Sequence, residues 1–182
     1  MPSRLPPDVR SSLEPIRLLI LDVDGVLTDG SLIYGPEGEI HKVFNARDGM
    51  GIRLLMDEGL KVGVISGRSY PAVMSRMQEL GIEEGMVILG SRNKSEDMNL
   101  LQQRAGSCSN RETVAIGDDL PDLPMLLKAG FSACPADAST DVAAVCSYVC
   151  GSRGGAGVVR EVAELILKAR GRWSDMLSIW KS

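Results

Sequence analysis

Short apolar runs alternate along the chain with longer stretches in which apolar residues recur at helical spacing. The runs are rich in Val, Ile and Leu and predict strands over 16–21, 61–65, 86–89, 113–116, 131–133 and 148–149. The stretches between them predict helices over 49–58, 71–80, 94–105, 122–128 and 158–169. This alternation favours an α/β fold in which helices cover a mainly parallel sheet.

One segment departs from the alternation. Residues 31–34 and 39–44 are two β-type runs joined by Gly35-Pro36-Glu37-Gly38, and they predict a β-hairpin over 31–44. The hairpin directly follows the first predicted strand and the acidic turn after it. We therefore expect the hairpin to stand beside that turn as a flap.

Composition and charge narrow the class of protein. The 182 residues, 44% apolar and 24% charged, suit a single domain over 1–182, with a core over about 16–169 and a tail over 170–182. A net charge of −4 argues against nucleic-acid binding, although a local arginine cluster can still attract a small anionic substrate. No apolar run approaches the ~18 residues of a membrane span. Residues 1–15 lack the apolar centre of a signal peptide, so a cytoplasmic protein is expected.

The four cysteines lie in the second half of the chain, at 108, 134, 146 and 150. The spacing of Cys146 and Cys150 has no second cysteine pair to complete a metal site, and the single histidine, His41, is far away in sequence. Free cysteine is often buried, so we expect reduced core cysteines.

The stretch Asp22-Val23-Asp24-Gly25-Val26 follows the apolar run 18–21. It puts two carboxylates at the carboxyl edge of the predicted sheet, where open α/β folds bind ligands. One acid can attack a phosphorus atom while the other handles a proton. An EF-hand calcium loop would need a glutamate at its twelfth position, and counting from Asp22 that position is Ile33.

Three later strand ends carry matching chemistry. Ser66 can donate a hydrogen bond to a phosphate oxygen or cap a helix, and Lys94 can neutralise phosphate charge or solvate a surface. Acids at 118, 119 and 122 follow a further strand, and neighbouring carboxylates raise one another's pKa unless a cation shares them. A hard divalent ion such as Mg²⁺, bound by Asp22, Asp118 and a backbone carbonyl, would relieve that repulsion.

With acid, hydroxyl, lysine and acid in this order, the chain resembles the haloacid dehalogenase-like phosphohydrolase superfamily. Its four motifs match 22–26, Ser66, Lys94 and 117–122. The resemblance implies a three-layer Rossmann-like fold, a catalytic set of Asp22, Asp24, Ser66 and Lys94, and an aspartyl-phosphate intermediate. It also implies a Mg²⁺ site made by Asp22, Asp118 and the carbonyl of Asp24. The short spacing between motifs leaves no room for a cap domain, so the site is expected to be open unless another subunit covers it.

Stretches at 27–30, 44–53, 66–68 and 154–161 are similar to one capless family, the 3-deoxy-D-manno-octulosonate 8-phosphate (KDO 8-phosphate) phosphatases. This resemblance implies a magnesium-dependent homotetramer that hydrolyses an acidic sugar phosphate in lipopolysaccharide biosynthesis. The family's substrate-binding positions fall on Asp24, Asn45, Ala46, Arg47, Asp48, Gly49, Arg53, Arg68, Arg76 and Lys94. In the family the glycine-rich stretch at 154–157 is thought to reach a neighbouring subunit's site; the alternative is a plain loop before a helix.

The four arginines match a substrate with a carboxylate and a phosphate, because guanidinium binds both groups bidentately. Arg53 and Arg76 lie in predicted helices, where they can instead be solvated surface residues. Two rival functions stay open. One is a sibling phosphatase acting on 2-keto-3-deoxynononate 9-phosphate. The other is a catalytically idle oligomerisation module of a sugar nucleotidyltransferase, which the complete set of acids and lysine disfavours.

Overall fold

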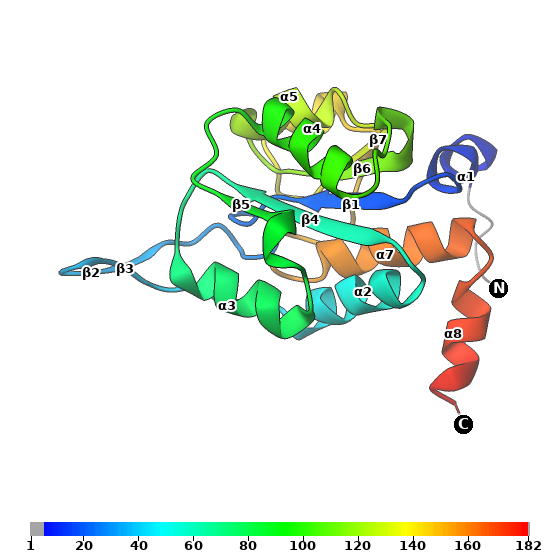
Figure 1. The fold of residues 1–182 in the computed structure, drawn as a ribbon, viewed down its shortest axis with the longest axis horizontal. Helices are drawn as coiled ribbons and strands as arrows, with labels where there is room; N and C mark the ends of the chain where they lie inside the picture. The colour runs from blue at the N-terminus through cyan, green and yellow to red at the C-terminus, as the bar shows by residue number, and fades with distance from the viewer. Residues whose placement is uncertain (1–5, 182) are drawn as a thin grey trace.

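The computed structural model describes residues 6–181, and these form a layered α/β fold around one parallel sheet (Figure 1). The strand order is β5-β4-β1-β6-β7-β8. The strands are β1 (Leu18–Leu21), β4 (Lys61–Ser66), β5 (Val87–Leu89), β6 (Thr113–Ile116), β7 (Phe131–Cys134) and β8 (Tyr148–Val149). The six predicted strands are confirmed, with β1 beginning at Leu18 rather than at residue 16.

Helices cover both faces of the sheet, with α4 and α5 on one side and α2, α3 and α7 on the other (Figure 1). These five correspond to the predicted helices: α2 (Ala46–Asp57), α3 (Pro71–Leu80), α4 (Lys94–Arg104), α5 (Leu123–Leu126) and α7 (Val158–Ala169). Helix α2 begins before the predicted residue 49 because Asn45 caps it, with its side-chain oxygen accepting from the Arg47 backbone N–H at 2.8 Å. The three-layer Rossmann-like prediction is confirmed.

Among residues 6–181, three helices and three single turns were not predicted. The helices are α1 (Pro7–Leu13), α6 (Thr140–Val145) and α8 (Trp173–Ile179), and the 3₁₀ turns are η1 (Glu84–Met86), η2 (Asn110–Glu112) and η3 (Leu120–Asp122). Helix α8 lies in the predicted tail and runs away from the sheet (Figure 1). Arg172 pairs with Glu58 at 2.9 Å, and the Trp173 ring lies 5.3 Å from the Arg160 guanidinium carbon, so the start of α8 is attached to α2 and α7.

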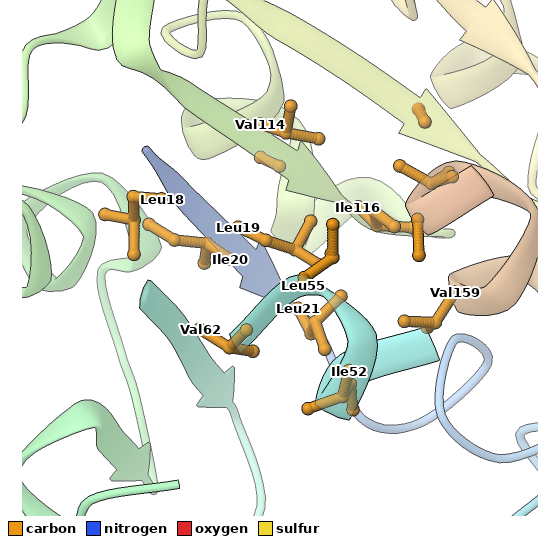
Figure 2. Packing of buried hydrophobic residues seen from close by; sticks show 14 of the residues in the cluster. Leu18, Leu19, Ile20, Leu21, Ile52, Leu55, Val62, Val114, Ile116 and Val159 are labelled. Atoms are coloured by element: carbon orange, nitrogen blue, oxygen red, sulfur yellow. The ribbon is translucent and has the colours of Figure 1, made fainter. Parts of the chain in front are cut away.

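The core is built around β1, whose four residues are fully buried. In Figure 2 the side chains of β1 lie near Val62 of β4, Ile116 of β6 and Leu55 of α2. A central parallel strand covered on both faces needs a continuous apolar run, which explains why residues 18–21 do not alternate. Each such leucine or isoleucine contributes about 1.5–3 kcal/mol of burial free energy, so the strand that carries the acidic turn is firmly anchored.

The predicted hairpin is present as β2 (Ile33–Gly35) and β3 (Gly38–His41), which pair antiparallel. It projects well away from the sheet (Figure 1), and it exposes Leu32, Tyr34 and Val43. It is the part of the described chain that lies between β1 and α2, where a cap domain would otherwise be inserted. Its role as a flap stays a prediction.

All four cysteines carry free thiols, and Cys108, Cys134 and Cys150 are buried as predicted for core cysteines. Within residues 6–181, no helix has both the length and the apolar character required to cross a membrane.

Candidate active site

The side chains predicted to do chemistry gather at the carboxyl edge of the sheet. Because β1, β4 and β6 are parallel neighbours, the residues that follow them emerge at one edge. A cavity of about 290 Å³ opens there, lined in part by Asp22, Asp24, Lys94, Asp118 and Arg68. The predicted convergence of separate strand ends is therefore present.

Three carboxylates form a compact group at this edge. Oxygen atoms of Asp22, Asp118 and Asp122 all lie within 4.8 Å of one another. Gly25 makes the approach possible: its φ is +89°, and a Cβ at this position would lie 2.0 Å from Asp118 Oδ2. The acidic turn after β1 thus needs a glycine directly beneath the Asp118 carboxylate.

Burial and mutual repulsion shift the protonation of this group. Burial, reinforced by the charge of Asp122, raises the pKa of Asp22 to about 7, although Lys94 opposes the rise. Burial also raises the pKa of Asp118 to about 7, with further contributions from Asp122 and Asp119. Such acids are fully ionised together only when positive charge is shared among them.

Lys94 supplies part of that charge. Its ammonium group is buried at the start of α4, lies 2.5 Å from Asp22 Oδ1, and also contacts Asp122 Oδ1. Burial acts to lower the pKa of Lys94, but the two carboxylates outweigh it and raise that pKa. Lys94 is therefore a charged link between the β1 acid and the η3 acid.

Asp122 has both carboxylate oxygens engaged. Oδ1 contacts Lys94, and Oδ2 accepts the backbone N–H of Asp118 at 3.0 Å and of Asp119 at 3.3 Å. Asp122 thus orients the lysine and fixes the loop after β6. Asp22 and Asp118 remain as the carboxylates with capacity for a cation. An all-oxygen donor set of this kind, with room for water and phosphate, fits Mg²⁺.

Asp24 has a partner that the sequence did not reveal. Lys42, just after β3, makes an ion pair with Asp24 Oδ1, and its side chain is 1% exposed. The base of the hairpin is thereby attached to the acidic turn. The only sequence signal for Lys42 is a basic residue where the hairpin returns to the sheet, which by itself is common on surfaces.

Ser66 and Arg68 occupy the end of β4. Ser66 is buried, and its Oγ accepts the backbone N–H of Arg68 at 3.1 Å, which leaves its hydroxyl proton available for donation. Arg68 lines the cavity and hydrogen-bonds the hydroxyl of Tyr34 in β2. The structure therefore places one guanidinium group between the hairpin and the acids.

The other three arginines lie elsewhere. Arg53 of α2 donates to the Glu79 carbonyl at 3.0 Å, and Arg76 of α3 pairs with the Glu79 carboxylate at 2.9 Å. Both guanidinium groups therefore lie beside the last turn of α3. Arg47 lines a different hollow, of about 470 Å³, beside the start of α7. The structure does not bring these three into the cavity with the acids, and their part in substrate binding stays a prediction.

The segment 45–49 faces the start of α7. Asn45 donates to the Gly155 carbonyl at 3.1 Å, and Asp48, 1% exposed, accepts the backbone N–H of Gly157 and Arg160. Gly49 is buried and Ala46 is exposed. The carboxylate of Asp48 is thus enclosed and accepts backbone donors of α7, and its predicted part in substrate binding stays a prediction.

Comparison with known proteins adds the family context. Residues 87–162 match the family model for haloacid dehalogenase-like hydrolases. Over 166 residues the chain is 41% identical to the 3-deoxy-D-manno-octulosonate 8-phosphate phosphatase KdsC of Haemophilus influenzae, with 91% of each chain covered. It is 42% identical over 169 residues to the protein of the same name from Escherichia coli K12, covering 92% of this chain and 88% of the relative.

Solved structures agree over most of the chain. The 3-deoxy-D-manno-octulosonate 8-phosphate phosphatase of Moraxella catarrhalis, in complex with magnesium, phosphate and KDO, aligns with a TM-score of 0.90 at 36% identity, covering 95% of this chain and 98% of that one. The cobalt-bound phosphatase of H. influenzae gives a TM-score of 0.86 at 42% identity, covering 90% and 94%.

Proposed function

Because this chain belongs to the 3-deoxy-D-manno-octulosonate 8-phosphate phosphatase family of haloacid dehalogenase-like hydrolases, we propose that it hydrolyses KDO 8-phosphate to KDO and inorganic phosphate, a step of lipopolysaccharide biosynthesis. The observation that carries the proposal is the carboxylate group at the sheet edge. Asp22 and Asp118 present oxygens within 4.8 Å of each other, and Lys94 lies against Asp22. A carboxylate nucleophile beside a buried ammonium group, with a second carboxylate able to share a cation, is the arrangement that phosphoryl transfer needs.

The first half of the reaction transfers the phosphoryl group to the chain. A carboxylate oxygen of Asp22 forms a bond to phosphorus while the bond from phosphorus to the sugar oxygen breaks. Asp24 acts as the general acid: its carboxyl group gives a proton to the departing sugar oxygen and becomes the carboxylate that pairs with Lys42. Lys94 and the hydroxyl of Ser66 stabilise the charge on the transferring group.

The second half releases phosphate. Asp24, now a carboxylate, takes a proton from water as the water oxygen attacks phosphorus. The bond from Asp22 to phosphorus then breaks, and both acids return to their starting forms. Lys42 lies against Asp24 and holds it at the base of the hairpin.

Asp22, Asp118 and the main-chain carbonyl of Asp24 are the groups proposed to hold Mg²⁺. When bound, the ion neutralises phosphate charge and polarises the phosphoryl group. The relative from M. catarrhalis contains magnesium, phosphate and KDO together, which supports this choice of cofactor and substrate.

The proposal also includes an oligomeric state and a cellular compartment. The exposed apolar residues on and beside the hairpin, Leu32, Ile33, Tyr34 and Val43, support a homotetramer in which neighbouring subunits cover the hairpins. The four free thiols support a cytoplasmic location, where thiols stay reduced. Light scattering after size exclusion tests the tetramer, and cell fractionation tests the compartment.

The direct test is phosphate release by the purified protein. The substrates are KDO 8-phosphate, 2-keto-3-deoxynononate 9-phosphate and p-nitrophenyl phosphate, each assayed with Mg²⁺ and with EDTA. We expect Mg²⁺-dependent release with the highest kcat/KM on KDO 8-phosphate. Preference for the nine-carbon substrate would establish the sibling activity, and no release from any substrate would indicate the idle module.

Asp22→Asn is the matched variant, because it keeps the size of the side chain and removes the nucleophile. We expect it to lose turnover while its circular dichroism spectrum stays that of the wild type. Phosphate release at the wild-type rate would refute the assignment of Asp22 as nucleophile.

A further inference from the structure

The loop at residues 151–157, here called the glycine loop, packs directly on the main chain of residues 22–28, here called the acidic loop. The Gly155 backbone N–H donates to the Val26 carbonyl at 2.9 Å. A Cβ at Gly154 would lie 1.9 Å from the Gly25 carbonyl oxygen, so the two backbones touch with no side chain between them. The position of the acidic loop therefore depends on where the glycine loop is held.

Asp48 holds the glycine loop from the α2 side. Its Oδ2 accepts the Gly157 backbone N–H at 3.1 Å, and its Oδ1 accepts the Arg160 backbone N–H at 2.9 Å. These donors belong to the first turn of α7, where backbone N–H groups have no partner within the helix. Asn45 adds a third bond at 3.1 Å, from its amide to the Gly155 carbonyl.

The loop after β7, residues 135–139, holds the glycine loop from the other side. Asp137 Oδ1 accepts the Gly154 backbone N–H at 2.9 Å. The same loop reaches the acid group, because the Ser139 backbone N–H donates to the Asp118 carbonyl at 2.8 Å. Asp118 and the acidic loop are thus fixed by one connected set of hydrogen bonds.

We propose that Asp48 is a positioning residue for the phosphatase reaction. By fixing the glycine loop against the acidic loop, it sets the place of Asp24 and of Gly25 beneath the Asp118 carboxylate. The inference rests on the proposed function, and it gives Asp48 a role other than the predicted contact with substrate. It also gives the glycine loop a role inside its own chain.

The two roles for Asp48 have different kinetic signatures. If Asp48 binds the sugar, its loss raises KM for KDO 8-phosphate and leaves KM and kcat for p-nitrophenyl phosphate unchanged. A positioning residue that sets Asp24 and Asp118 lowers kcat for both substrates, because both use the same reacting groups. A residue that only stabilises the fold lowers the melting temperature and leaves kcat of the folded protein unchanged.

The test compares Asp48→Asn with the wild type, on both substrates, well below the melting temperature of each protein. In the variant an amide N–H₂ group, which cannot accept, replaces one carboxylate oxygen, so one of the two backbone donors at the start of α7 loses its acceptor. We expect kcat to fall about 10- to 100-fold on both substrates, as for a displacement near 1 Å, with KM for KDO 8-phosphate unchanged.

Glu112→Gln is the matched control. Glu112 also accepts a backbone N–H, from Ser109 at 2.9 Å, and pairs with Arg17 at 3.1 Å. It precedes β6 at the opposite, amino-terminal edge of the sheet. We expect this variant to lose stability and keep wild-type kcat.

Asp137→Ala serves as a second variant that keeps the test decisive if Asp48→Asn does not fold, since Asp137 is partly exposed. It should lower kcat on both substrates in the same way. The inference would be overturned if a folded Asp48→Asn protein kept the wild-type kcat or changed only in its KM for KDO 8-phosphate. If Asp48→Asn does not fold, wild-type kcat in Asp137→Ala would overturn it. An inactive wild type would instead count against the proposed function.

Discussion

Replacing Gly25 with alanine should disable the metal site at a modest stability cost. The added Cβ would lie 2.0 Å from Asp118 Oδ2 and 2.4 Å from its Cγ. Non-bonded carbon and oxygen atoms need more than about 3 Å, so the carboxylate or the acidic loop must move by at least about 1 Å. Either movement changes the position of Asp118 relative to Asp22.

The magnitude follows from two separate terms. Gly25 has a φ of +89°, and a side chain in the left-handed region costs about 1–2 kcal/mol. For a chain of this size that corresponds to a fall in melting temperature of about 2–8 °C. Displacement of a reacting or metal-binding group by about 1 Å lowers the rate by roughly 100-fold.

Gly59→Ala separates these two terms. Gly59 has a φ of +82°, and a Cβ there would have no atom within 4 Å. It should therefore show the same loss of stability without the displacement. Calorimetric titration with Mg²⁺ and steady-state kinetics would be measured on both variants beside thermal unfolding. Wild-type Mg²⁺ affinity and kcat in Gly25→Ala would refute the close contact between Gly25 and Asp118.

Three further predictions follow from the same geometry. Lys94→Met should lower kcat by at least about 100-fold. It should also lower the free energy of unfolding in EDTA by about 3–5 kcal/mol, because the buried Asp22 and Asp122 lose their cation. An unchanged urea midpoint would contradict the predicted loss of stability. Arg68→Ala should raise KM for KDO 8-phosphate far more than for p-nitrophenyl phosphate, whereas equal losses would confine Arg68 to holding the hairpin. Mg²⁺ at 100 times its Kd should stabilise the wild type by about 2.7 kcal/mol in thermal unfolding, and Asp118→Asn should abolish that shift.

The sheet and its main helices could be predicted because each buries a whole face in the core. Burial of a whole face requires apolar residues at regular spacing in the sequence. Strand β1 is buried on both faces, and α7 buries a continuous face, so their periodicity is strong. Helices α1 and α8 were missed because each buries a single residue, Leu13 and Met176 respectively. A helix with one buried position has no repeating signal in the sequence.

Some residues of the candidate site could likewise be predicted from the sequence, and others could not. Asp22, Lys94 and Asp118 follow strands or begin a helix, so the parallel topology alone brings them together. The roles of Lys42 and Asp48 depend on contacts with Asp24 and with the α7 backbone, and no local pattern records such contacts. A charged residue beside other charged residues has the same appearance in the sequence whether it is enclosed or exposed.

The acid group also shows why its surroundings are rich in glycine. A Cβ at Gly117 would lie 2.4 Å from the Cβ of Asp122, just as one at Gly25 would meet Asp118. At both positions a carboxylate is packed on bare backbone, where N–H groups can reach it; Asp122 Oδ2 accepts two of them. These backbone donors satisfy one oxygen of Asp122 without adding a second mobile charge, so Asp22 and Asp118 keep their capacity for a cation. The acids and the glycines around them therefore act as one unit, and a change in either should have the same effect on Mg²⁺ binding.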